Sequence, residues 1–301
     1  MITFIERNRT VFGVEPICRL LPIAPSTYYA HRAVDRNPDL ACDRAKRDIV
    51  DRQKITAVYD DSTRRYGARK LWRQLRRDGH RIARCTVERL MKTMGLQGVV
   101  RGKKVITTQP DTARPCPDDK VNRVFAASRP NRLWVSDFTF VSTWQGTIYV
   151  AFVIDVFARK IVGWRVSTSM TTALVLDALN QAIGQRLSSK APGLIHHSDR
   201  GSQYLALRYT ERLAQAGIDT SVGSVGDSYD NALAESVIGR FKAEVINLLG
   251  PWKSMAQVEW QTLTWVHWFN TKRLHGAIGY VTPNQAEDDF HASLDNTNKA
   301  A

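Results

Sequence analysis

The spacing of apolar residues changes near residue 131 of the chain. Before that point apolar positions recur every three or four residues, as at Val87, Leu90, Met91 and Met94, which is the period of an amphipathic helix. After it, apolar residues run through short stretches bounded by turn residues, which is typical of strands. The pattern therefore predicts a helical N-terminal part followed by a part built around a sheet.

The first helical segment is predicted over residues 1–43. Residues 13–31 form a short helical unit that Pro22 interrupts, and Ser26 suits the N-cap of its second helix. The polar stretch that follows, up to Asp43, is predicted to be a linker.

Residues 44–97 are predicted to form a helix-turn-helix-like DNA-binding module. Its last two helices, 66–77 and 83–94, are joined by the tight turn Asp78-Gly79. The final helix directs basic side chains outward, which suits a recognition helix in a DNA major groove. The DNA-binding candidates of this module are Arg69, Arg84, Arg89 and Lys92.

Residues 98–130 show no apolar period and contain several prolines. Lys103 and Lys104 lie at their start, so we predict a basic, proline-containing linker that lies along DNA and uses both lysines.

The strand pattern beyond residue 131 predicts an α/β unit over residues 131–250. Three strands read as an antiparallel meander, and helices and strands then alternate until Gly250-Pro251 ends the last helix. The order βββαβαβα is that of a ribonuclease-H-like mixed sheet with flanking helices. A Trp-rich helical extension over 251–290 and a disordered tail over 291–301 are predicted to follow.

Charge is distributed unevenly along the chain. The net charge is +14, and residues 1–130 carry all of that excess while residues 131–301 are neutral. A basic arm on a neutral unit indicates a nucleic-acid partner, with a merely soluble basic surface as the alternative. Four scattered cysteines, no secretory signal and no apolar run long enough for a membrane span favour a cytosolic protein without a zinc site.

Three carboxylates are the candidate catalytic residues. Asp137 lies within an apolar strand, Asp199 ends another strand, and Glu235 lies in the closing helix, with 35 residues between Asp199 and Glu235. Such carboxylates can bind a pair of divalent ions that act on a phosphodiester. Lys242 shares the helix face of Glu235, where it is placed to hold a DNA phosphate.

Each of these residues also has an ordinary interpretation. A single carboxylate in a strand or helix is usually solvated. Asp155 is the main rival to Asp137, and it could equally be a turn residue. His196 and His197 read mainly as strand residues, Asp227 and Asp230 read as loop and N-cap positions, and the Trp residues of the extension read as core.

Four motifs stand out in the chain. They are Trp134-Val-Ser-Asp137-Phe-Thr, His197-Ser-Asp199-Arg-Gly-Ser-Gln-Tyr204, Asp230-Asn231-Ala-Leu-Ala-Glu235-Ser with Lys242, and Phe269-Asn-Thr-Lys-Arg273-Leu-His275 with Thr282-Pro283. These motifs resemble those of a known family, the insertion-sequence transposases of the IS-three group, and in particular their second-reading-frame (OrfB) product. The resemblance covers nearly the whole chain. The triad and its spacing are shared with retroviral integrases, although no His/Cys zinc module precedes the core here.

The resemblance implies a DDE transposase with two Mg²⁺ (or Mn²⁺) ions held by the triad. Water would nick a transposon end, and the freed 3′-OH would attack a target phosphodiester. The implied partners are terminal inverted repeats, target DNA, further copies of the chain, and the first-reading-frame (OrfA) protein or a fusion with it, in the bacterial cytoplasm at the nucleoid. The motifs add Asn231, Gln203, Arg273 and His275 to the DNA-binding candidates.

Two other functions remain open from the sequence. One is a ribonuclease-H or resolvase-like nuclease that cuts without strand transfer. The other is a catalytically inactive DNA-binding regulator derived from a transposase, against which the intact triad argues.

Overall fold

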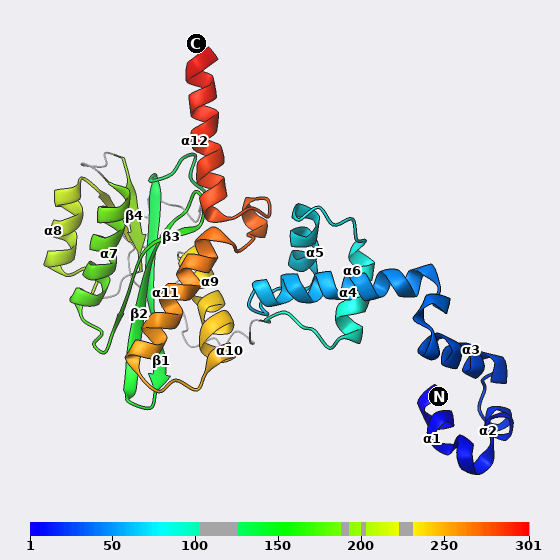
Figure 1. Ribbon diagram of the computed structural model, residues 1–301. Coiled ribbons are helices and arrows are strands. Elements are labelled where there is room, and N and C mark those ends of the chain that lie inside the picture. Colours follow the sequence, from blue (N-terminus) through cyan, green and yellow to red (C-terminus); the bar gives the residue numbers. More distant parts are fainter. Residues whose placement is uncertain (101, 103–125, 188–192, 200–202, 223–230, 301) are drawn as a thin grey trace, which may run out of the picture.

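The computed structural model describes residues 1–100, 102, 126–187, 193–199, 203–222 and 231–300 of the chain. Figure 1 shows two helical parts formed by the N-terminal third, and an α/β part that contains the sheet. The α/β part has a mixed five-stranded sheet with helices on both faces, which is the predicted ribonuclease-H-like, integrase-type fold.

The sheet has the strand order β3-β2-β1-β4-β5. Strands β1 (Leu133–Thr143), β2 (Gly146–Asp155) and β3 (Lys160–Ser167) form the predicted antiparallel meander. Strands β4 (Ile195–Ser198) and β5 (Asp219–Val222) continue the sheet in parallel with β1. The long strand β1 therefore lies at the centre.

Each face of the sheet buries its own hydrophobic cluster. Helices α7 (Thr172–Arg186) and α8 (Leu207–Ala216) cover one face. The other face is covered by α9 (Ala232–Phe241) and α11 (Met255–Thr271), and a π-helical segment η2 (Lys242–Ile246) and α10 (Asn247–Leu249) connect these two helices. Because side chains alternate along β1, Trp134 packs toward α7 and Val135 toward α9.

The four-residue strand β4 determines where the sheet is open. It pairs with β1 only over Leu133–Ser136, with Ser136 opposite Ser198 in the last position. Strand β1 continues to Thr143, so in the described residues its edge beyond Ser136 has no strand beside it. The carboxyl end of β4 thus lies where, among the described residues, this edge of β1 is no longer paired with a strand.

The predicted helix-turn-helix-like segment forms α4 (Asp43–Asp61), α5 (Ala68–Arg77) and α6 (Arg84–Thr93), called the helical module below. It packs beside the α9–α11 side of the α/β part (Figure 1). One continuous hydrophobic cluster runs from Leu71 and Leu90 of the module to Trp265 and Trp268 of α11. The Trp residues of the extension are thus largely core, as expected, although Trp260 is exposed.

The N-terminal lobe contains α1 (Ile2–Phe12), α2 (Val14–Leu20) and α3 (Pro25–Arg36), followed by a short 3₁₀ turn η1 (Pro38–Leu40). Its own small core is formed by Ile5, Ile17, Cys18 and Tyr28, and the lobe projects away from the sheet in Figure 1. The sequence pattern missed α1 and ended the lobe's last helix too early, because these helices bury few side chains and show little apolar periodicity.

The C-terminal extension continues from α11 through a 3₁₀ turn η3 (Gly276–Ile278) into α12 (Pro283–Ala300). The predicted disorder of residues 291–301 is therefore wrong as far as Ala300, because the helix that begins at Pro283 continues through them. None of the described helices is long and apolar enough to cross a membrane.

A buried ionic network attaches α12 to the sheet. Arg186 of α7 donates to Glu287 at 2.7 and 2.9 Å and lies 3.4 Å from Asp155, and Lys160 donates to Glu287 at 2.8 Å. Asp155 is fully buried and also accepts the N–H groups of Asn131 and Phe157. The rival carboxylate Asp155 is accordingly a structural turn residue.

Gly163 of β3 lies where α7 approaches the sheet most closely. A Cβ at this position would lie 2.2 Å from the backbone oxygen of Ala178. We expect Gly163→Ala to lower the free energy of unfolding by about 1–3 kcal/mol or more, because backbone atoms must move apart. Gly184, exposed on the same helix with no atom near its Cβ position, gives the matched control. Gly184→Ala should raise the free energy of unfolding by about 0.5–1 kcal/mol; urea unfolding of both variants measures the difference.

Candidate active site

The strand register places the first two carboxylates side by side. Ser136 and Ser198 are the last paired residues of β1 and β4, so Asp137 and Asp199 are the next residues on neighbouring parallel strands. Glu235 lies in the first turn of α9, the helix that packs on β1. The three candidate residues therefore lie on elements that meet at the part of β1 beyond its pairing with β4.

Burial and the charges of the other two carboxylates both favour the protonated form of Asp137. The pKa of Asp137 is raised to about 8, mainly by burial and in addition by the negative charges of Asp199 and Glu235. The Phe138 N–H, which donates to Asp137 Oδ1 at 2.8 Å, and the charge of Lys242 work in the opposite direction. Without a cation, this cluster of like charges favours a protonated Asp137 at neutral pH.

Buried hydrogen bonds hold the strand ends that carry the aspartates. The Ser136 hydroxyl and the His196 ring are 2.7 Å apart, and the same ring nitrogen is 3.0 Å from the Tyr209 hydroxyl. His197 and Ser221 make the equivalent contact between β4 and β5 at 3.0 Å. Burial lowers the pKa of His196 to about 3, so its ring stays neutral. Both histidines are structural strand residues, as expected.

Asn231 joins helix α9 to β1. It occupies the N-cap position of α9, one residue after the predicted N-cap Asp230, and its Nδ2 donates to the Ser136 backbone oxygen at 2.9 Å. The side chain is buried, so the predicted contact of Asn231 with DNA is wrong. Its role here is to fix the distance between the start of α9 and the backbone beside Asp137.

Lys242 lies at the junction of α9 and η2, seven residues after Glu235. Its ammonium nitrogen is 5.1 Å from the centre of the exposed Phe140 ring and its charge acts on Asp137. The structure therefore places this cation beside the carboxylates. Phe140 was not anticipated as a neighbour of the site, since an aromatic residue in a strand usually belongs to the core.

Two further DNA-binding predictions are wrong. Arg273 is buried and forms an ion pair with Glu244, and His275 is buried with its Nε2 3.2 Å from the Phe269 backbone oxygen. Their motif is polar in sequence, but the chain folds it underneath α11. Neither side chain is available to a DNA phosphate.

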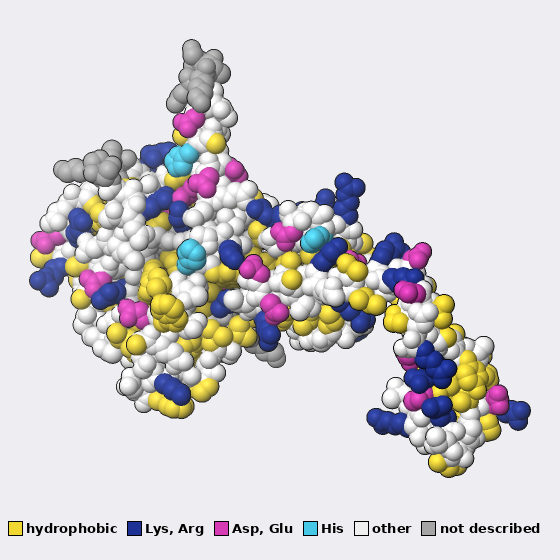
Figure 2. Space-filling model, viewed as in Figure 1, with side chains coloured by type: hydrophobic (Ala, Val, Ile, Leu, Met, Phe, Trp, Pro, Cys, Tyr) yellow, Lys and Arg dark blue, Asp and Glu magenta, His cyan; other side chains and the backbone are white. Residues whose placement is uncertain are grey.

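The remaining candidates have different surroundings. Arg69, Arg84 and Lys92 are exposed, with Arg84 paired to Glu88, whereas Arg89 makes a two-pronged contact with Asp48 of α4 at 2.7 and 2.9 Å. Gln203 is partly buried and donates to the Met170 oxygen at 3.4 Å. In Figure 2, Lys and Arg side chains are scattered over the helical parts. Lys103, Lys104, Asp227 and Asp230 lie outside the described residues.

The three carboxylates offer only oxygen donors, which suits Mg²⁺ or Mn²⁺. Burial, and after it the neighbouring carboxylates, raise the pKa of Asp137, and a bound cation would offset both effects. Within the described ranges, no three His, Cys, Asp or Glu side chains lie close enough together to form a complete ion site. The oxygen donors of the three carboxylates fit a divalent ion, but in the described residues they do not form a complete set of ligands.

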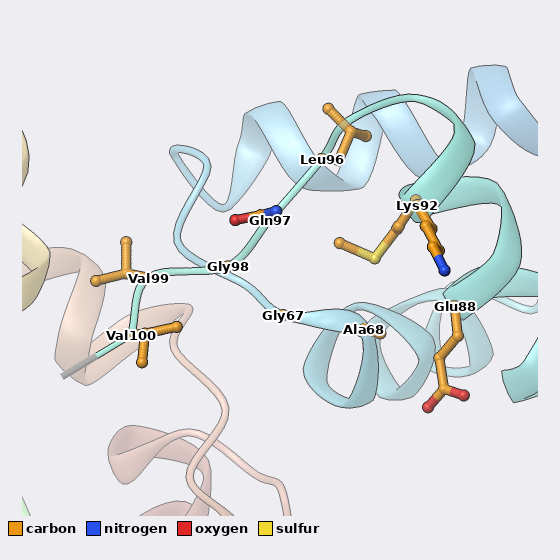
Figure 3. Close-up of a pocket in the computed structure, with 10 residues that line it drawn as sticks. Gly67, Ala68, Glu88, Lys92, Leu96, Gln97, Gly98, Val99 and Val100 are labelled. Carbon is orange, nitrogen blue, oxygen red and sulfur yellow. The ribbon is translucent and has the colours of Figure 1, made fainter.

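A pocket of about 430 Å³ lies in the helical module instead. Figure 3 shows Leu96, Gln97, Gly98, Val99 and Val100 along one side, with Glu88 and Lys92 of α6 on the other. This pocket is lined mainly by apolar side chains and backbone. None of Asp137, Asp199 and Glu235 lines it.

The raised pKa of Asp137 predicts a pH-dependent stability. The folded protein holds a proton on Asp137 up to about pH 8, whereas the unfolded chain loses it near pH 4, so this residue makes the metal-free protein less stable as pH rises from 4 to 8. We expect Asp137→Asn to raise the melting temperature in chelator, with a gain that increases between pH 5 and pH 8. Asp177→Asn, at an exposed position of α7, should show no such increase. A constant difference across this range would contradict the assignment.

Family models match three parts of the chain. An integrase core domain matches residues 127–228, a second integrase core domain model matches 216–283, and an HTH-like domain matches 46–104. The structural match is weaker: the HTLV-2 integrase catalytic core domain in complex with magnesium aligns at 18% identity with a TM-score of 0.40, covering 54% of this chain and 99% of that chain.

Curated relatives align over nearly all of the chain. The transposase for insertion sequence element IS629 of Shigella sonnei is 54% identical over 301 residues, which is 100% of both chains. The putative transposase for IS986/IS6110 of Mycobacterium tuberculosis is 50% identical over 90% of this chain and 97% of its own. Transposase InsF for insertion sequence IS3A of Escherichia coli is 31% identical over 81% and 83%. These similarities show that the chain belongs to the IS-three family of insertion-sequence transposases.

Proposed function

We propose that Asp137, Asp199 and Glu235 are the catalytic triad of this transposase and bind two Mg²⁺ or Mn²⁺ ions. The observation that carries the proposal is the strand register, which sets Asp137 and Asp199 just beyond the last paired residues of β1 and β4, with Glu235 on the helix that packs on β1. Bound ions would supply an activated water or hydroxyl and would stabilise the leaving oxygen of a phosphodiester. The proposed reaction is strand cleavage at a transposon end, followed by transfer of the 3′-OH to target DNA.

The side chains of the chain have separate tasks in this reaction. Asp137 must lose its proton before it can act as a ligand, which the raised pKa makes dependent on the arrival of positive charge. Lys242, held beside the site, would bind a phosphate next to the bond that breaks. Hydrolysis adds water across the P–O bond and frees a 3′-OH. In the second step this hydroxyl forms a new P–O bond while another target P–O bond breaks, so no net hydrolysis occurs.

Binding of DNA is assigned to the basic N-terminal part. Residues 44–97 would form the DNA-binding module and residues 131–250 the catalytic core, with Arg69, Arg84, Arg89 and Lys92 of the module contacting double-stranded DNA. The module's HTH-like match and the location of the entire charge excess in residues 1–130 support this division. The partners would be terminal inverted repeats and target DNA. Self-association and the first-reading-frame protein would complete the active complex at the bacterial nucleoid.

Substitution of the triad tests the catalytic proposal. Asp137→Asn, Asp199→Asn and Glu235→Gln should each reduce cleavage of terminal-repeat DNA and strand transfer by about 100-fold or more, because a metal site contributes several kcal/mol to the barrier. The assay follows labelled duplex DNA with Mg²⁺ or Mn²⁺, and again in chelator.

Asp177→Asn serves as the control, because this exposed carboxylate lies on α7 and should leave both activities unchanged. Wild-type activity in any triad variant would show that the assignment of that residue is wrong. A wild-type chain that cuts but never joins a pre-cut 3′-OH end to target DNA would instead indicate a simple nuclease.

The proposed partner predicts weak DNA discrimination by the chain alone. In band-shift assays, terminal-repeat and unrelated duplexes should bind with similar affinity, and this binding should weaken steeply with salt because phosphate contacts dominate it. Addition of the first-reading-frame protein should favour the terminal repeat. Tight, sequence-specific binding by this chain alone would contradict the need for that partner.

A further inference from the structure

Glu244 is a buried carboxylate that the proposed chemistry does not use. It lies nine residues after Glu235 on one continuous helical run, inside the π-helical segment η2. Its side chain is 7% exposed and is flanked by Ala243 and Val245, which are also buried. Short π-helical segments are rare in proteins, and those that occur often lie at functional sites. Contacts from two other parts of the chain hold η2 in place.

The carboxylate of Glu244 is held by the C-terminal extension. Arg273 donates to it through Nε and Nη2, with Nε 3.1 Å from Oε2. Trp265 of α11 donates its indole N–H to Oε2 at 3.0 Å. These bonds outweigh burial and keep the pKa of Glu244 below its usual value, so the group remains charged.

The backbone of Glu244 is held by the helical module. Arg65, which lies between α4 and α5, donates from Nε to the Glu244 backbone oxygen at 2.9 Å. Its guanidinium carbon is 5.0 Å from the centre of the Trp268 ring, and the side chain is 9% exposed. Arg65 is therefore a buried cation of the module that binds the backbone of the catalytic helix.

The position of Arg65 is itself fixed within the module. Its backbone oxygen accepts the N–H of Val99, and Gly98 lies so close to Gly67 that a Cβ there would be 2.3 Å from the Gly67 nitrogen. The hydroxyl of the neighbouring Tyr66 accepts the Leu274 N–H at 2.7 Å, and the Tyr66 ring lies tilted beside the Trp268 ring. A movement of the α4–α5 connection relative to α11 would therefore disturb the contact with Glu244.

We propose that Arg65 is a positioning residue that couples the helical module to α9 and η2 through its hydrogen bond to the Glu244 backbone oxygen. DNA bound to the module would order α9 and η2 through this contact and so place Glu235 beside the two aspartates. The inference rests on the proposed function, because it assigns DNA binding to the module and catalysis to the triad.

The helix between the two residues is suited to transmit such a movement. Nine residues of helix rise by about 14 Å. Because Asn231 holds the start of α9 to β1, a displacement at Glu244 would tilt the helix about that end and so reorient Glu235.

Hydrogen exchange of the full chain tests the coupling without requiring catalysis. We expect terminal-repeat DNA, at a concentration that saturates the wild type and in the absence of metal, to slow amide exchange in residues 232–246. Arg65→Met preserves the volume of the side chain but removes its N–H donor, and it should reduce this slowing by about two- to thirtyfold while DNA still binds. Arg64→Met, at the adjacent exposed arginine, is the matched control and should behave as wild type.

Single-turnover cleavage at saturating DNA provides the second measurement. Arg65→Met should lower the cleavage rate by a similar factor at unchanged DNA affinity, and Arg65→Lys, which keeps the charge and an N–H donor, should recover part of it. If Arg65→Met does not fold, the comparison of Arg65→Lys with wild type decides in the same way.

Two results would overturn the inference. One is an Arg65 variant that is folded and retains both the DNA-induced slowing and the cleavage rate; the other is loss of DNA binding in parallel with loss of cleavage, which would assign Arg65 to the module alone. A wild-type chain that shows the DNA-induced slowing but no cleavage would contradict the proposed function and leave the coupling intact.

Discussion

The pairing of β4 with the first four residues of β1 determines the geometry of this protein's site. Because the two strands are parallel and end their pairing at Ser136 and Ser198, the next residue of each strand is an aspartate at the same level. A shift of one residue in this register would turn every side chain of β4 to the opposite face. The Ser136–His196–Tyr209 and His197–Ser221 hydrogen bonds lie in these last paired positions and oppose such a shift. The hydrophobic faces of the sheet supply most of the stability, and these few polar contacts select the register.

The fold and the position of the triad were predictable from the sequence because they depend on local patterns. Alternation and turn residues predicted the meander, and the motif contexts placed Asp137 in a strand and Glu235 in a helix, where the structure has them, while Asp199 directly follows its strand. The burial of Asn231, Arg273 and His275 was not predictable in this way. Each belongs to a polar motif, and whether a polar motif faces solvent or a neighbouring helix depends on packing between distant segments. The charged residue Glu244 between apolar neighbours was a signal that could have been noticed, since a buried charge requires a partner.

Positive charge has two distinct uses in the chain. On the surface of the helical module, exposed arginines and lysines supply much of the excess of the first 130 residues. Within the interior, Arg65, Arg186 and Arg273 each bind a specific carboxylate or backbone oxygen and join segments far apart in sequence. Net charge alone does not separate these classes, and a substitution of a buried arginine removes a connection between elements rather than an attraction for DNA.

The attachment of α12 has a consequence for the gene as well as for the protein. Arg186 is 14% exposed in its side chain, and its closest ionic partner, Glu287, comes from the last helix of the chain. A premature stop codon just before Glu287 would remove the carboxylate that both Arg186 and Lys160 bind. Arg186 would then keep Asp155 as its ionic partner in this network. Such a truncation would spare every residue of the triad and every residue of the helical module. It would nevertheless weaken the junction of β2, β3 and α7, so an insertion-sequence copy shortened at its 3′ end would lose stability before it lost any catalytic residue.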